Sequence, residues 1–161
     1  MTTKLLKIFL LFVFGIVHSQ NNHIIETSDI DNFWNAYDKL KNAVNNNDSI
    51  NIMQTEYIDK SSEYFKEFIK VRNCNAEEYI KLFKKYPKFW ISIRKETENV
   101  KYRKEEIIKI LDKYEQEIPN FKRSNVCFGI GCLRTGGTVS NNLILIGTEI
   151  AASTHKTDKS E

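Results

Sequence analysis

The sequence predicts a mostly helical α+β protein, and three observations support this class. Apolar residues recur at helical spacing from about residue 29 to Pro119. After Phe121, apolar residues alternate with small ones, as they do in strands. The first 19 residues have the composition of an export signal. We therefore expect a bundle of four to five helices followed by a C-terminal β-hairpin.

The first segment of the chain, residues 1–19, is predicted to be a secretory signal peptide. Lys4 and Lys7 precede an uncharged apolar run, residues 8–17. This run is about half of the roughly 20 residues that a membrane-spanning helix needs. We expect cleavage before Gln20, which leaves a periplasmic or secreted chain with no transmembrane span.

The mature chain is expected to be nearly neutral and to form one domain. The 24 Lys and Arg residues less Lys4 and Lys7 leave 22, against 21 Asp and Glu. Residues 81–113 are basic and contain aromatic residues, a combination that occurs in nucleic-acid-binding proteins. The aromatic residues have helical core spacing, however, so a solvated basic face is expected and nucleic acid is not a predicted partner. The alternative is a basic face that binds an anionic envelope surface.

Residues 20–120 are expected to form the helical region. Ser28 and Asp31 have the spacing of a capping box, and the apolar pattern that follows predicts a helix from about residue 29 to residue 44. Residues 45–49 are polar and predict a turn, because Asn, Asp and Ser side chains compete for backbone hydrogen bonds.

The rest of the helical region is expected to contain further helices. Asn75 and Glu78 repeat the capping pattern, and the helix that they begin must end before Pro87. Later apolar positions continue the pattern to Pro119. Between the turn and Asn75, a single second helix is expected to carry Met53, Tyr57, Tyr64, Phe65, Phe68 and Ile69.

Residues 121–150 are predicted to form the hairpin region. Alternation in residues 126–130 and the apolar run 143–146 each predict a strand. We expect the two strands to pair across an enlarged loop, residues 132–142. Residues 151–161 are polar, and we expect them to form a disordered tail.

The glycines in the last quarter of the chain do not form a nucleotide-binding motif. The segment from Gly131 to Thr138 matches the spacing of a phosphate-binding loop but lacks its lysine, and a strand is expected after it instead of a helix. The segment from Gly129 to Arg134 has arginine where a dinucleotide fingerprint has its third glycine. Nucleotide binding is therefore not expected.

The three cysteines are an odd set for an exported protein. Cys127 and Cys132 are close enough in sequence to pair across a turn, which would leave Cys74 free. The alternative is that all three are small, half-buried side chains.

The sequence shows no catalytic or metal-binding constellation. His18 leaves with the signal peptide, while His23 and His155 lie near opposite ends of the mature chain. No two histidines have the i, i+4 spacing that places two imidazoles on one helical face. Thr138 and Ser140 have no histidine near them in sequence.

The segment from residue 126 to residue 149 resembles part of a known family. It contains Ile130-Gly131, then Gly136-Gly137-Thr138-Val139-Ser140, then the run from Leu143 to Glu149 that ends in Ile-Gly-Thr-Glu. These features resemble a family of exported bacterial zinc-dependent proteases, similar in layout to gliding-motility-associated lipoproteins. In that family a helix carrying HExxH follows, with two histidines as zinc ligands and a glutamate that polarises the attacking water.

This sequence contains no HExxH, so the resemblance supplies no zinc ligands or catalytic residues here. It implies a truncated N-terminal portion of such a peptidase, inactive alone, whose hairpin would belong to a larger zincin-like sheet. Zinc is expected only in full-length relatives. The implied partners are an extended peptide and a missing C-terminal catalytic half. The alternative is a complete, small, exported helical module that binds a partner or associates with the cell envelope without catalysis.

The resemblance also implies a substrate-binding edge, because an antiparallel edge strand in such enzymes pairs with the extended substrate. We place that edge strand at residues 143–146 and the loop that shapes it at residues 136–140. The alternative is a sheet-core strand beside a turn that needs glycine. Glu149 is expected to be a solvent-facing strand end, and the alternative is that it faces the cleft. The predicted substrate-binding residues are Gly136, Gly137, Thr138, Ser140, Leu143, Ile144, Leu145 and Ile146.

Overall fold

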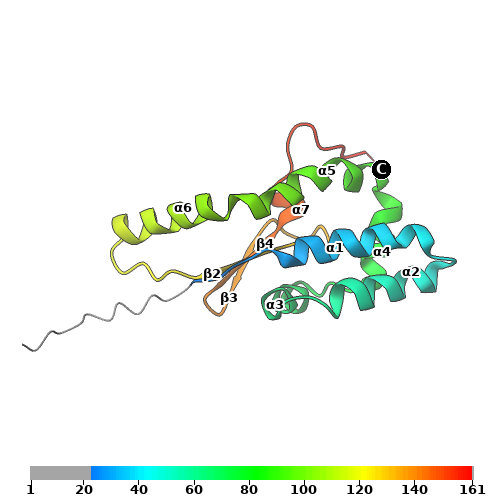
Figure 1. Cartoon of the computed structure of the whole chain (residues 1–161), viewed down its shortest axis with the longest axis horizontal. Helices are drawn as coiled ribbons and strands as arrows, with labels where there is room; N and C mark the ends of the chain where they lie inside the picture. Colours follow the sequence, from blue (N-terminus) through cyan, green and yellow to red (C-terminus); the bar gives the residue numbers. More distant parts are fainter. Residues whose placement is uncertain (1–22, 161) are drawn as a thin grey trace, which may run out of the picture.

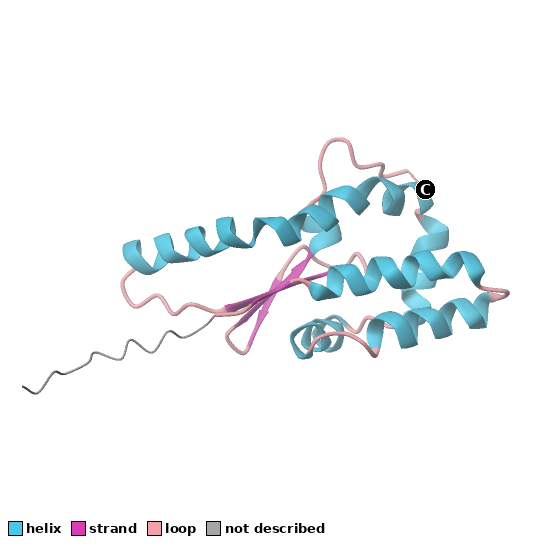
Figure 2. Ribbon diagram, in the orientation of Figure 1, coloured by secondary structure: helices cyan, strands magenta, loops and turns pink. Residues whose placement is uncertain are grey.

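The computed structural model describes residues 23–160, and the predicted signal peptide lies outside this range (Figure 1). The predicted class is confirmed, because residues 23–160 are mostly helical and contain one small sheet (Figure 2). The helices are α1 (Ser28–Lys39), α2 (Asn46–Met53), α3 (Glu63–Arg72), α4 (Ala76–Lys85), α5 (Pro87–Asn99), α6 (Lys104–Glu117) and α7 (Thr148–Ala151), with short η1 (Leu40–Asn42), η2 (Gln54–Ile58) and η3 (Val100–Arg103). The strands are β1 (Ile25–Glu26), β2 (Asn125–Gly129), β3 (Thr138–Ser140) and β4 (Leu143–Gly147).

The first helix is close to its predicted range, but its start differs from the predicted capping box. Ser28 is already helical, and Thr27 occupies the cap position without a side-chain cap bond. The Glu26 carboxylate accepts hydrogen bonds from the backbone N–H groups of Thr27 (2.8 Å) and Ser28 (2.7 Å) instead. An acidic side chain before the helix thus satisfies amides at its N-terminus.

The predicted second helix is broken, and this prediction was wrong. The π-helical turn η2 follows α2 directly, and Ser62 then caps α3 by accepting from the N–H of Phe65 (3.1 Å). The Asp29 carboxylate accepts from the backbone N–H of Ser62 (2.8 Å), which fixes the break against α1. The predicted turn 45–49 is also different, because Asn45 caps α2 by accepting from the N–H of Asp48 (2.9 Å).

The boundaries around Asn75 and Pro87 are confirmed. The Asn75 side chain accepts from the backbone N–H of Glu78 (2.9 Å), as the capping pattern predicts. Helix α4 ends at Lys85, and Pro87 is the first residue of α5, where its missing N–H has no helical partner to lose.

An aromatic cluster fills the helical core around the fully buried Phe33. Ring centroids of Trp34 and Tyr57 lie 4.8 and 5.2 Å from that of Phe33, in edge-to-face arrangements. Such geometry adds about 0.5–1.5 kcal/mol per pair beyond burial of the rings. Tyr79, Phe83 and Trp90 complete the cluster from α4 and α5.

The sheet is mixed, with strand order β1-β2-β4-β3. Strands β2 and β4 are parallel, with Val126 opposite Ile144, so the predicted antiparallel pairing of these two strands was wrong. The antiparallel hairpin joins β3 to β4 instead, through a two-residue turn at Asn141 and Asn142. Both have positive φ, 45° and 60°, as a type I′ turn requires.

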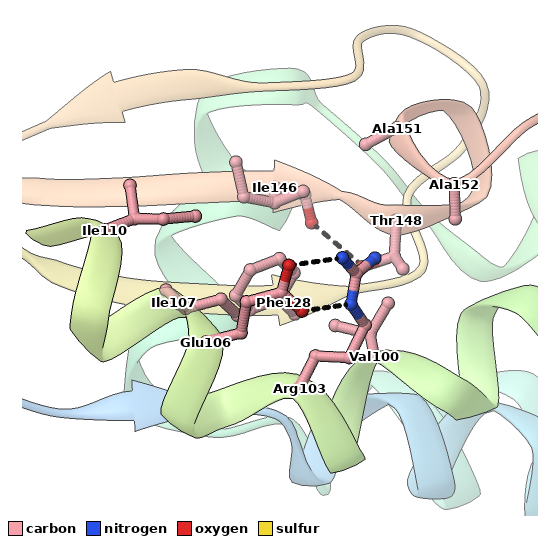
Figure 3. Close-up of a pocket in the computed structure, with 10 residues that line it drawn as sticks. All are labelled: Val100, Arg103, Glu106, Ile107, Ile110, Phe128, Ile146, Thr148, Ala151 and Ala152. Carbon is pink, nitrogen blue, oxygen red and sulfur yellow. Dashed lines mark hydrogen bonds and ion pairs between the residues drawn. The ribbon is translucent and has the colours of Figure 1, made fainter.

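The sheet lies between α3 and α6. On one face, a Cβ added at Gly129 would meet the Phe65 ring at 2.3 Å, and one added at Gly131 would meet Phe68 at 2.8 Å. On the other face, Phe128 and Ile146 point toward α6 (Figure 3). The two glycines therefore allow α3 to pack closely beside β2.

The C-terminal residues 152–160, expected to be disordered, lie against α5. Thr157 is buried, and the backbone N–H of Asp158 donates to the Ser92 hydroxyl (3.0 Å). The Lys88 ammonium reaches the Ser160 hydroxyl (3.4 Å). These contacts place the polar segment along the helix.

Replacing Gly147 with alanine is expected to lower the free energy of unfolding by about 1–3 kcal/mol, the usual cost of overpacking. A Cβ at Gly147 would lie 2.1 Å from the Thr135 carbonyl oxygen, so the backbone must move. Gly137→Ala is the matched control, because its Cβ would meet the nearest atoms at 3.5 and 3.6 Å. Urea unfolding of both variants measures the difference, and equal midpoints would show that the loop at Thr135 yields freely.

Candidate functional site

Residues 130–133, which we call the strap, leave the end of β2 and are held by buried polar groups. The Ile130 carbonyl accepts hydrogen bonds from the hydroxyls of Tyr57 (2.6 Å) and Tyr79 (2.8 Å). The backbone N–H of Ile130 donates to the Tyr57 hydroxyl (3.1 Å). Burial raises the pKa of both phenols well above the usual value, so they stay neutral.

Glu149 holds the strap from the side of α7. It is fully buried, and its carboxylate accepts from the backbone N–H groups of Gly131 (2.7 Å) and Leu133 (3.1 Å). Burial raises its pKa to about 7, although these N–H groups favour the charged form. The expectation of a solvent-facing strand end was therefore wrong, because α7 begins at Thr148 and turns Glu149 inward.

The strap is also tied covalently, because Cys132 forms a disulfide with Cys74, at the junction of α3 and α4. The predicted Cys127–Cys132 pair is not formed. Cys127 is a free, buried thiol on β2, and it donates to the Asp29 carboxylate (3.8 Å). Burial and the nearby Asp29 raise the pKa of the Cys127 thiol, which keeps it protonated and unreactive.

The glycine loop between the strap and β3 packs over the start of α7. The Thr135 hydroxyl donates to the Gly137 carbonyl (2.7 Å) and accepts from its N–H (3.2 Å). A Cβ at Gly136 would lie 3.2 Å from Ile150. Arg134, next to the strap, pairs with Glu78 on α4 (2.7 Å). The position of the loop therefore depends on that of the strap.

Strand β3 is one edge of the sheet, with β1 at the other edge, and β4 is interior. The prediction that residues 143–146 form an edge strand was wrong, because β4 pairs with β2 on one side and with β3 on the other. Thr138 and Ser140 do lie at the edge, and the Ser140 hydroxyl is bonded to the Glu67 carboxylate (2.7 Å). The structure therefore places Gly136, Gly137, Thr138 and Ser140 in β3 and the loop before it. Leu143, Ile144, Leu145 and Ile146 lie in β4, the strand that pairs with β3.

A hollow lies between α6 and the sheet, and the sequence did not predict it. It encloses about 220 Å³ and is lined mainly by apolar residues of η3, α6, β2, β4 and α7 (Figure 3). Two hydrogen bonds of 2.8 Å join Arg103 to Glu106 in its lining. The volume is below the roughly 300–1,000 Å³ that is usual for small-molecule sites.

The described residues do not fit a zinc site. Within residues 23–160, no three His, Cys, Asp or Glu side chains converge in a way that would hold a metal ion.

The same part of the chain contains no helix long and apolar enough to cross a bilayer.

Comparison of the chain with protein-family models, with curated proteins and with solved structures found no match.

The Glu149 carboxyl is expected to make the protein less stable as pH rises from about 4.5 to 7. Its pKa is raised in the folded chain, so the folded state binds the extra proton in this window. The stabilisation is complete below the unfolded pKa and is lost as pH rises through about 7. A shift of this size corresponds to about 3 kcal/mol.

The measurement is urea unfolding from about pH 4 to pH 8 for the wild type and Glu149→Gln. The difference between the two curves isolates Glu149 from Asp29, whose pKa burial also raises. Parallel pH profiles for the two proteins would contradict the assignment.

Proposed function

We propose that this chain is the non-catalytic, peptide-binding part of an exported zinc-dependent peptidase of the family that residues 126–149 resemble. The observation that carries the proposal is the exposed antiparallel edge at β3, which has β4 on one side only. An open edge binds an extended peptide through main-chain hydrogen bonds, largely irrespective of the peptide sequence.

Val139 supplies the main-chain groups for this pairing. In a hairpin with a two-residue turn, the residues that flank the turn form a hydrogen-bonded pair, here Ser140 and Leu143. Hydrogen-bonded and non-hydrogen-bonded pairs alternate, so the N–H and C=O of Val139 point away from β4. A peptide strand laid beside β3 can exchange two hydrogen bonds with Val139.

The surroundings of Val139 leave this edge accessible. Val139 is 69% exposed, and Gly137, two residues before it, adds no side chain to the approach. On the inner side, the bond between Ser140 and Glu67 of α3 anchors β3 to the helical layer. The edge is therefore short, open and fixed in position.

In this proposal, hydrolysis depends on a catalytic half that carries HExxH, a motif that this sequence lacks. The purified chain is accordingly expected to bind peptides of casein without cleaving intact casein. Zinc would be bound by that catalytic half.

Val139→Pro tests the edge directly. Proline removes the outward N–H but no hydrogen bond to β4, and edge strands tolerate proline at such positions. We expect binding of fluorescein-labelled tryptic peptides of casein, measured by fluorescence anisotropy, to weaken about five- to tenfold, the value of one net hydrogen bond.

Val139→Thr is the matched control, because it keeps the backbone N–H and the branched shape, and its affinity should stay within about twofold of the wild type. Equal affinities for Val139→Pro and wild type, with an intact circular dichroism spectrum, would place any peptide site elsewhere.

The alternative is an exported binding or envelope-associated module that acts without catalysis. The observation that favours it is that the β3 edge and the hollow beside α6 are both formed within the described residues and use no catalytic group. Reading the DNA beyond the Glu161 codon in all three frames separates the two. An HExxH with a following apolar helical pattern supports the peptidase, and its absence supports the module.

A further inference from the structure

We propose that the Cys74–Cys132 disulfide and the Glu149 carboxylate form a latch that holds the strap and, through it, the β3 edge, and that a dithiol reductant opens this latch more readily as pH rises. The inference depends on the proposed function of that edge, because it describes how peptide binding there is regulated.

The disulfide and the Glu149 carboxylate hold neighbouring residues of the strap, and each does so from a different element. Cys132 is bonded to Cys74, beyond the end of α3, while the amides on either side of it, Gly131 and Leu133, donate to Glu149 of α7. The disulfide therefore keeps both amides over the carboxylate, and the carboxylate in turn stays out of water.

The strap does not keep its shape by backbone preference alone. Leu133 has φ of 56°, in the left-handed region that residues other than glycine rarely adopt. Such a conformation persists only where surrounding contacts enforce it. Once the disulfide is lost, the bonds to Glu149 and the Arg134–Glu78 ion pair remain as the ties nearest to Leu133.

Movement of the strap reaches β3 through four residues. Arg134 to Gly137 connect the strap to Thr138, and the Thr135 carbonyl lies close against Gly147, at the start of α7. When the strap opens, this carbonyl leaves Gly147, and the first residue of β3 loses the loop that positions it.

Opening begins with thiol–disulfide exchange between the reductant and the Cys74–Cys132 bond. A dithiol reductant transfers two electrons and two protons, so that the Cys74–Cys132 S–S bond breaks, each cysteine becomes a thiol, and the dithiol becomes a disulfide. Cys74 and Cys132 are nearly buried, which slows attack on either sulfur in the closed state.

Opening of the reduced strap also releases a proton above mildly acidic pH. The closed site raises the pKa of Glu149 to about 7, whereas water restores an ordinary carboxyl. Protonation therefore favours the closed strap, and rising pH favours the open one.

The groups that face Glu149 do not compete with this titration. The phenols of Tyr57 on η2 and Tyr79 on α4 stay neutral, and Phe68 on α3 is apolar. The strap contributes backbone amides and a disulfide, which does not titrate. Asp29 on α1 lies beyond Tyr57 and is bonded to Ser62.

The test measures amide hydrogen exchange of residues 131–140 in the mature chain, oxidised and reduced with dithiothreitol, at about pH 5 and about pH 8, corrected for intrinsic exchange. In the reduced chain we expect opening to increase on the order of fiftyfold between the two pH values, as linkage to Glu149 requires. The oxidised chain should show little change.

Two variants serve as controls. Cys74→Ser should reproduce the reduced behaviour without dithiothreitol, which excludes an effect of the reagent. Reduced Glu149→Gln should show opening that is independent of pH. Equal protection of Gly131 and Leu133 in oxidised and reduced chains at both pH values would overturn the latch.

Binding of the casein peptides in the same states separates this inference from the proposed function. Weaker peptide binding by the reduced chain at about pH 8 supports both the proposed function and the latch. Lost protection without peptide binding in any state overturns the proposed function and supports the latch as the device that holds β3. Peptide binding that is identical in all four states overturns the latch as a regulator of the edge.

Discussion

The buried carbonyl of Ile130, with the hydroxyls of Tyr57 and Tyr79 bonded to it, is the contact on which the arrangement of helices and sheet depends. It joins the end of β2 to the aromatic cluster, so it fixes where the sheet stops and the strap begins. Leaving a buried polar group without a partner costs about 1–3 kcal/mol, so the chain cannot slide along β2 without losing both bonds. These bonds therefore fix where the strap leaves β2, while the disulfide and Glu149 hold the residues that follow.

Local signals in the sequence predicted the elements that depend on local chemistry. Asn75 caps α4, Pro87 starts α5, and the alternating residues form β2, because each of these features is decided within a few residues. The direction of pairing could not be predicted in the same way. Whether β2 lies parallel or antiparallel to β4 depends on β3, which is only three residues long and too short to show a period.

The predicted arrangement of the candidate site differs from the structure. Residues 138–140 were expected in a loop but form β3, and the open edge belongs to β3 instead of β4. Cys132 pairs with a cysteine 58 residues away, and nothing in the spacing of the three cysteines favours that partner. The burial of Glu149 depends on the strap folding back over α7, a contact between segments whose sequences carry no sign of it.

The disulfide encloses α4, α5, α6 and β2 in one covalent loop. In the chain-entropy description, closing a loop of this length restricts the unfolded chain by about 4 kcal/mol. The loop also includes the exposed link between α6 and β2 at Pro119 and Asn120. A protease that cuts there leaves two polypeptides joined through sulfur, so a nicked molecule keeps its mass until it is reduced. Resistance to fragmentation is thus a property of the cross-link, independent of whether the backbone is intact.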